Sequence, residues 1–159
     1  MSGAEDPLPG LTLTKVAHVR VALDPVLTVG PTAQGLRRVV PIVGGTIDGE
    51  RLRGRILPGG ADWQLVHEDG TAVIDTRYTA RTDDGALIHL ATTGVRHGPA
   101  AVLERVAAGE PVDPREYYFR VGVRLEAGDP RYAWLNRTVF VAYAARLADA
   151  VAYDLYALD

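Results

Sequence analysis

A histidine and a tyrosine on neighbouring segments are the side chains best suited to proton transfer in this sequence. Tyr78 and His89 flank the dipeptide Asp84-Gly85, which is typical of the tight turn of an antiparallel hairpin. With a two-residue or a four-residue loop the two side chains lie on one face of the hairpin, whereas an odd loop with a bulge would separate them. A histidine titrates near neutral pH, and an adjacent tyrosine donates a hydrogen bond or relays a proton. We therefore take His89 and Tyr78 as the candidate catalytic pair. The alternative is a structural histidine whose ring is satisfied by the tyrosine hydroxyl.

A second dipeptide of the same kind sets the neighbours of this pair. With Asp69-Gly70 as a two-residue loop, Trp63 falls on the same face as Tyr78, and this face is predicted to point into the protein. Asp62 then falls on the other face, opposite Arg77. Asp62 is a second candidate for acid–base chemistry, but a surface ion pair with Arg77 is the simpler interpretation.

Aromatic and amide side chains complete the candidate site. The expected ligand-binding residues are Trp63, Phe119, Trp134, Asn136 and Tyr117. The two tryptophans are expected to form the wall of a cavity more than a stacking platform. Asn136 would either orient a ligand carbonyl or cap a turn.

Cofactor and metal chemistry have no motif in this sequence. There is no cysteine, and the four histidines are scattered without a His-x-His spacing, which argues against a metal site. A phosphate loop, a dinucleotide-binding fingerprint and a nucleophile elbow are also missing. We expect neither a metal nor a cofactor.

Length and charge restrict the class of protein and its partners. The 159 residues suit one domain, and the 47% of hydrophobic residues is ordinary for a globular protein. A formal net charge of −3 argues against a nucleic-acid surface. No apolar run approaches the roughly 20 residues that span a bilayer, and the polar start of the chain is no signal peptide. We expect a cytoplasmic protein that binds a small molecule, without nucleic acid or membrane partners. A homo-oligomer is left open.

Alternating apolar and polar residues predict a chain made almost entirely of strands. Residues 1–10 are expected to be a flexible lead-in, and residues 99–108 the one helix, with Pro99 at its start and Gly109 after its end. The predicted strands cover 11–23, 26–29, 37–47, 50–57, three segments between 54 and 94, 116–126, 137–147 and 150–158. Nine or ten short-connected strands favour a single antiparallel, closed or nearly closed β-barrel over residues 11–159, because closure removes exposed edges. A two-sheet sandwich is the alternative.

Several phrases are more specific than composition. They are LPGGADWQ (57–64), RYTARTDDGALI (77–88), GVRHGP (94–99), EYYFR (116–120) and YAWLNRTVFV (132–141). With them the chain resembles the bacterial domain of unknown function 3237 family over roughly residues 8–158. The resemblance implies a small antiparallel barrel of the lipocalin and streptavidin type, and it leaves the activity open. After EYYFR this chain is more aliphatic than the family pattern, so a roomier and greasier cavity follows if that segment lines the barrel.

The functional expectation combines these observations. The barrel would bind a largely apolar organic molecule and act on it as a cofactor-independent biosynthetic enzyme of the cyclase, isomerase or lyase type, with His89 as the acid or base. A non-catalytic carrier or sensor is the first alternative. The second is a structural oligomer subunit with a filled barrel.

Overall fold

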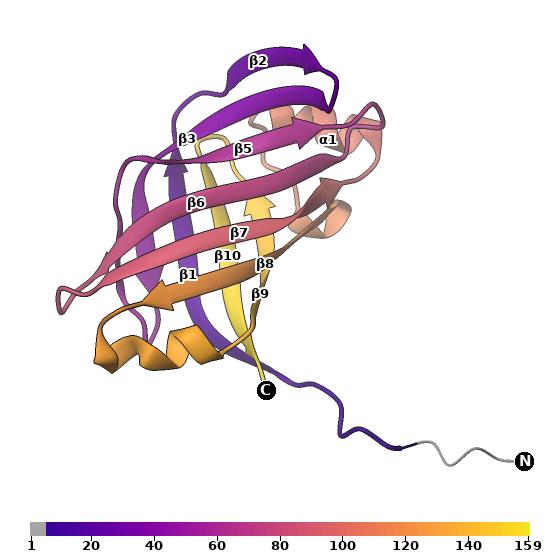
Figure 1. The fold of residues 1–159 in the computed structure, drawn as a ribbon. Coiled ribbons are helices and arrows are strands. Elements are labelled where there is room, and N and C mark those ends of the chain that lie inside the picture. Colours follow the sequence, from indigo (N-terminus) through magenta and orange to yellow (C-terminus); the bar gives the residue numbers. More distant parts are fainter. Residues whose placement is uncertain (1–5) are drawn as a thin grey trace, which may run out of the picture.

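Ten strands form one antiparallel sheet in the computed structural model, which describes residues 6–159 (Figure 1). The strands are β1 (Leu13–Leu23), β2 (Leu27–Thr32), β3 (Gly35–Asp48), β4 (Gly54–Ile56), β5 (Gly60–Val66), β6 (Ala72–Thr82), β7 (Leu87–His97), β8 (Tyr118–Ala127), β9 (Phe140–Arg146) and β10 (Ala150–Leu158). The expected lead-in falls partly on residues 1–5, which lie outside the described residues. Residues 6–12 form neither helix nor strand.

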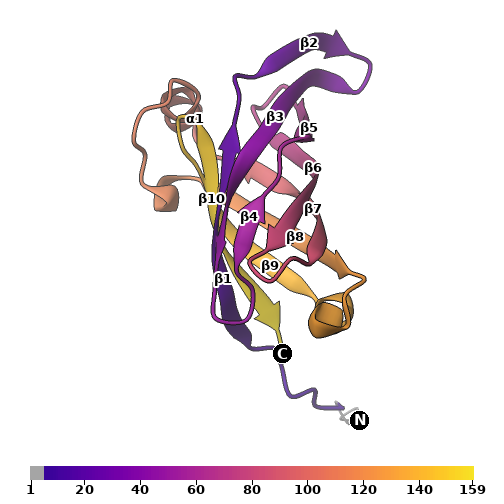
Figure 2. The ribbon, with the colours of Figure 1, turned by 90° about the vertical axis from the view of Figure 1, so that its left-hand side faces the viewer.

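The sheet closes into a barrel because β1 pairs with β10 on one side and with β3 on the other. β3 pairs with β5 along one half of its length and with β4 along the other, and both short strands also pair with β6. β4 and β5 therefore share one position, which gives eight positions around the barrel. β2 pairs only with β3, and the two strands form a hairpin that projects from one end of the barrel (Figure 2). The predicted barrel is confirmed.

The two ends of the barrel carry different short helices. Helix α1 (Ala100–Ala107) follows Pro99 and stops before Gly109, whose φ of 75° is the conformation that glycine favours after a helix. It lies at the same end as the β2–β3 hairpin, whereas the 3₁₀ helix Pro130–Arg137 lies at the opposite end (Figures 1 and 2). Val106 of α1 and Leu135 of the 3₁₀ helix are buried against the core. Within residues 6–159, no helix combines the length and the hydropathy needed to cross a membrane.

The turns before and after β6 have three-residue loops. His67 N–H donates to the Thr71 carbonyl at 2.9 Å, and Thr82 N–H donates to the Ala86 carbonyl at 2.8 Å. In each loop the third residue is a glycine with positive φ, 87° at Gly70 and 95° at Gly85, as in a type I turn followed by a bulge. The predicted loops have an even number of residues, so the observed loops differ from them by one residue. Because side chains alternate along a strand, this difference moves every side chain of the partner strand to the other face.

The third Asp-Gly dipeptide makes no tight hairpin. β3 ends at Asp48, and β4 begins only at Gly54, so a longer connection replaces the predicted turn. Leu52 in this connection is buried, while Arg51 and Arg53 beside it are exposed. The connection thus contributes an apolar side chain to the core near the 3₁₀ helix.

Candidate functional site

A cavity lies inside the half of the barrel that is away from the 3₁₀ helix Pro130–Arg137. The space available to the centres of water molecules is about 50 Å³, several times the roughly 10–15 Å³ that one water needs. Its apolar walls include Val21, Val40, Ile42, Ile74, Phe119, Val121 and Val151. The other half of the barrel is filled by side chains such as Phe140, Leu135 and Leu155. The protein therefore has one packed end and one hollow end.

Asp62 is a buried carboxylate on the wall of this cavity, with an exposed fraction of 8%. The ladder between β5 and β6 is interrupted between the pairs Asp62–Thr76 and Leu65–Val73. In this gap the Asp62 carboxylate accepts a hydrogen bond from the Asp75 backbone N–H at 3.0 Å, and another from the Gln64 amide at 3.0 Å. Burial raises the pKa of Asp62 above its usual value, although these hydrogen bonds and Arg96 oppose the shift. A carboxyl group with a raised pKa in a cavity is suited to donate or accept a proton.

Three half-buried arginines lie on other strands, and two of them, Arg96 and Arg146, line the cavity together with Asp62. Arg38 of β3, Arg96 of β7 and Arg146 of β9 all interact electrostatically with it. Burial, together with the charges of Arg146 and Arg38, lowers the pKa of Arg96 to about 10, so it stays charged at neutral pH. None of the nine ion pairs among residues 6–159 includes these three arginines. The cavity therefore holds more positive than negative charge.

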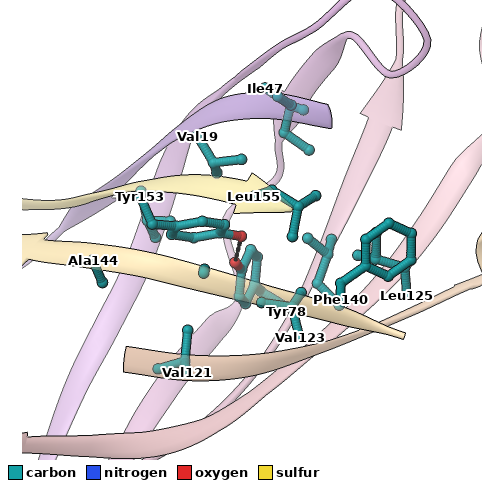
Figure 3. Close-up of a cluster of buried hydrophobic side chains, with 14 of the residues drawn as sticks. Val19, Ile47, Tyr78, Val121, Val123, Leu125, Phe140, Ala144, Tyr153 and Leu155 are labelled. Carbon is teal, nitrogen blue, oxygen red and sulfur yellow. Dashed lines mark hydrogen bonds between the residues drawn. The ribbon is translucent and has the colours of Figure 1, made fainter. Parts of the chain in front are cut away.

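Two hydroxyl pairs complete the polar lining. The hydroxyls of Tyr78 and Tyr153 lie 2.6 Å apart and point toward each other from β6 and β10 (Figure 3). Burial raises the pKa of Tyr153 to about 12, and burial together with its partner raises the pKa of Tyr78 well above 10. The pair has two protons and uses one between the hydroxyls, so one remains for a ligand. Thr76 and Thr92 form a similar hydroxyl pair one step further along β6 and β7.

The prediction that Tyr78 and His89 share one face of the hairpin is wrong. The structure pairs Tyr78 with Leu90 and His89 with Thr79, because the loop between β6 and β7 has three residues. Tyr78 is 4% exposed and points inward, whereas His89 lies on the outer face and is exposed. Tyr78 and His89 are therefore not brought together.

The predicted faces of β5 are also reversed. Asp62 lies opposite Thr76 instead of Arg77, so Asp62 and Gln64 point inward, and the surface ion pair of Asp62 with Arg77 does not form. Trp63 points outward and is 41% exposed. The physical reason is again a three-residue loop where two residues were predicted.

The remaining predicted ligand residues fall in three places. Phe119 lines the cavity, with the Arg96 guanidinium 5.4 Å from its ring. Tyr117 is buried outside the cavity lining, and its hydroxyl accepts a hydrogen bond from the backbone N–H of Arg146, a lining residue, at 2.8 Å.

Trp134 and Asn136 lie in the 3₁₀ helix at the packed end, away from the cavity. Trp134 packs edge-on against Phe140, with Arg51 stacked on it. Asn136 bonds both the N–H and the carbonyl of Ala127 at 2.8 Å and so caps the end of β8.

Sequence reasoning missed Gln64 and the three arginines, although the arginines leave a signal. Each lies on the same face of its strand as the buried residues. Arg38 is two residues before Val40 and four before Ile42, and Arg146 follows Ala142 and Ala144 at the same spacing. A charged residue on the apolar face of three strands indicates a polar interior. Asp62 and Gln64 give no such signal, because Trp63 and Leu65 on the other face are more apolar.

The fold and the cavity together define a small closed antiparallel β-barrel with a positively charged, partly hollow interior. A family model described as "Protein of unknown function (DUF3237)" matches residues 11–158, and the chain belongs to this family. The resemblance found in the sequence is thereby confirmed.

Two crystal structures share this barrel along their whole length. The chain is similar to a β-barrel-like protein from Acinetobacter baumannii AYE, with 49% identity, a TM-score of 0.86, and coverage of 98% of this chain and 100% of that one. A crystal structure of a conserved protein of unknown function from Rhodopseudomonas palustris has 37% identity, a TM-score of 0.90, and coverage of 96% and 100%.

Two more distant proteins carry names that refer to biosynthesis or catalysis. "PR-toxin biosynthesis cluster protein 7" of Penicillium roqueforti is 27% identical over 150 residues, which cover 82% of this chain and 80% of that protein. A crystal structure described as an enzyme from Penicillium herquei is 18% identical, with a TM-score of 0.69 and coverage of 96% and 98%. At that identity the second likeness shows the fold alone.

Proposed function

We propose that the barrel cavity binds a small, largely apolar organic molecule and performs acid–base chemistry on it without a cofactor. The reaction would be a cyclisation, isomerisation or elimination in a biosynthetic pathway, because each of these needs little more than a proton moved between positions. The observation that carries the proposal is the buried carboxyl group of Asp62, whose pKa is raised, on the wall of a cavity that is otherwise mainly apolar.

The chemistry divides between two sets of side chains. Asp62 is held by hydrogen bonds from Asp75 N–H and Gln64, so its carboxyl group is oriented before a ligand enters. It accepts a proton from one atom of the ligand in the first step and returns the proton to another atom of the ligand in the next. The remaining proton of the Tyr78–Tyr153 pair is available to an oxygen of the ligand. The name of the Penicillium roqueforti relative supports a biosynthetic role.

The filled-barrel alternative fits the interior less well. A purely structural core would bury apolar groups at the positions of Asp62 and Gln64, since a buried polar group without a partner costs about 1–3 kcal/mol. Gln64 is 2% exposed and its carbonyl oxygen has no hydrogen-bond partner among residues 6–159. An open, polar end of the cavity is easier to explain as a binding site.

Asp62→Asn tests the acid–base role. Wild type and variants are incubated in heavy water with a small-molecule extract of the organism that encodes the chain. Native mass spectrometry detects bound compounds, and mass spectrometry of the extract detects products and deuterium uptake. We expect wild type to convert or label at least one compound, and Asp62→Asn to bind it with at least 100-fold slower conversion, in the range of general acid–base catalysis.

Glu126→Gln is the matched control, because it makes the same carboxylate-to-amide change on the exposed outer face of β8. His89→Phe is the second control, and both are expected to behave like wild type. Equal conversion by Asp62→Asn and wild type would contradict the role of Asp62. A compound that wild type binds and never changes would favour the carrier alternative.

A further inference from the structure

The charge balance of the cavity narrows the chemistry of its ligand. Arg96 and Arg146 line the cavity together with one carboxylate, Asp62, and Arg38 of the neighbouring strand β3 also interacts with this carboxylate electrostatically. Arg146 donates to the carbonyls of Leu147 and Ala150, which are neutral acceptors. No carboxylate among residues 6–159 pairs directly with any of the three. All three arginines are half-buried, and charges withdrawn from water are normally paired, so the surplus positive charge calls for an anion.

Two polar atoms on adjacent strands have no hydrogen-bond partner, and they narrow the chemistry of the ligand further. Arg38 and Gln64 are cross-strand neighbours in the pairing of β3 with β5. The Arg38 Nε–H donor and the Gln64 Oε1 acceptor are the buried side-chain atoms of residues 6–159 that have no hydrogen-bond partner. The large majority of buried side-chain polar atoms are paired in folded proteins. One needs an acceptor and the other a donor, so a ligand that satisfies both carries an anionic oxygen and a hydroxyl group.

The rest of the lining selects an organic molecule over an inorganic ion. Val40, Ile42, Ile74 and Val121 present apolar surface to the same space. A phosphate or sulfate ion would leave this surface in contact with water, whereas a carbon skeleton would bury it. The ring of Phe119 beneath Arg96 offers a further apolar contact next to the charged group.

We propose that this cavity recognises a small hydroxycarboxylic acid, with its carboxylate on Arg38 and Arg96, its hydroxyl donating to Gln64, and its carbon skeleton against the apolar wall. This inference rests on the proposed function, since it names the substrate class of the same cavity. It places the reacting part of the ligand beside Asp62, because Gln64 also donates to the Asp62 carboxylate.

A binding experiment tests the ligand class without any turnover. A panel of aliphatic and aromatic hydroxycarboxylates is compared with the corresponding amides, which are neutral, and with the acids that lack the hydroxyl. Melting temperature and isothermal titration calorimetry give the affinities. We expect acids of the panel to bind, the amides to bind at least 10-fold more weakly, and the deoxy acids to lie between them, since hydrogen bonds to charged groups are the stronger ones.

Variants assign the contacts. Arg96→Gln and Arg38→Gln are each expected to weaken the affinity for the acids about 10-fold or more and to leave the affinity for the amides unchanged. Gln64→Leu is expected to remove the preference for the hydroxyl and to keep the preference for the acid. Arg77→Gln is the matched control, because Arg77 is exposed on the outer face of β6.

Three results would overturn the inference. They are amides that bind as tightly as the acids, a panel in which no acid binds, and full affinity for the acids in both arginine variants. If inorganic phosphate competes as tightly as the best acid, the inference that the ligand is an organic molecule is overturned. The two proposals fail separately: acid binding with unimpaired conversion by Asp62→Asn contradicts only the proposed function, and loss of labelling in that variant without acid binding contradicts only the ligand class.

Discussion

At the scale of single residues, the Tyr78–Tyr153 pair joins the stability of the barrel to its cavity. Each hydroxyl is the hydrogen-bond partner of the other, and both rings lie among apolar side chains (Figure 3). Tyr78→Phe strands the Tyr153 hydroxyl, so we expect a loss of about 1–3 kcal/mol in the free energy of unfolding. The double change to Phe should lose less than the sum of the single changes, because it leaves no buried hydroxyl unpaired. Urea unfolding of the three variants checks this, and strictly additive losses would contradict the pairing.

The same pair predicts how stability depends on alkaline pH. The pKa of Tyr153 is raised to about 12 in the folded protein, above its ordinary value of 10. The folded state therefore holds this proton more tightly than the unfolded state does. The resulting stability is fully present below pH 10 and is lost as the pH rises through about 12. Denaturant unfolding across this range, with the double Phe variant as the control, measures the loss. An equal alkaline loss in the double variant would assign it to other groups.

At the scale of elements, the three-residue turns decide which side chains enter the barrel. Gly85 has a φ of 95°, and a Cβ atom added there would meet no atom within 4 Å. Gly85→Ala therefore tests backbone conformation alone, and we expect a loss of about 1–2 kcal/mol. Gly85→Asn should lose less, because asparagine tolerates this conformation. Thermal unfolding of both variants measures the difference, and equal losses would contradict the conformational explanation.

At the scale of the whole molecule, the proposed function implies that the charged cavity lowers the stability of the unliganded protein. Burial and the neighbouring arginines lower the pKa of Arg96, which means that its charge is unfavourable in the folded protein. Arg96→Met keeps the aliphatic stem and removes the charge. We expect the unliganded variant to be about 1 kcal/mol more stable, or about 2–4 °C higher in melting temperature. Arg77→Met on the outer face should change little, and an Arg96→Met variant less stable than wild type would indicate a structural role for the guanidinium.

Several properties follow from the sequence alone. Alternation along Leu13–Leu23 or Tyr118–Ala127 predicts a strand with one buried face, since side chains of a strand point alternately to its two sides. Pro99 and Gly109 bracket the helix, because these residues favour the start and the region after the end of a helix. Nine or ten predicted strands with short connections then favour closure. The barrel and its helix follow from such local patterns, whereas the family follows from the resemblance of phrases such as LPGGADWQ (57–64).

The inner wall was decided only by the tertiary structure. Loop length at Gly70 and Gly85 sets the register, and one residue of difference exchanges Trp63 for Asp62 inside the barrel and moves His89 to the surface. An Asp-Gly dipeptide suits both a two-residue and a three-residue loop, so local sequence does not distinguish them. Asp62, Arg38, Arg96 and Arg146, which interact electrostatically, come from four different strands of the chain. Only closure of the barrel brings these charges together, which is why the candidate site could not be predicted from spacing.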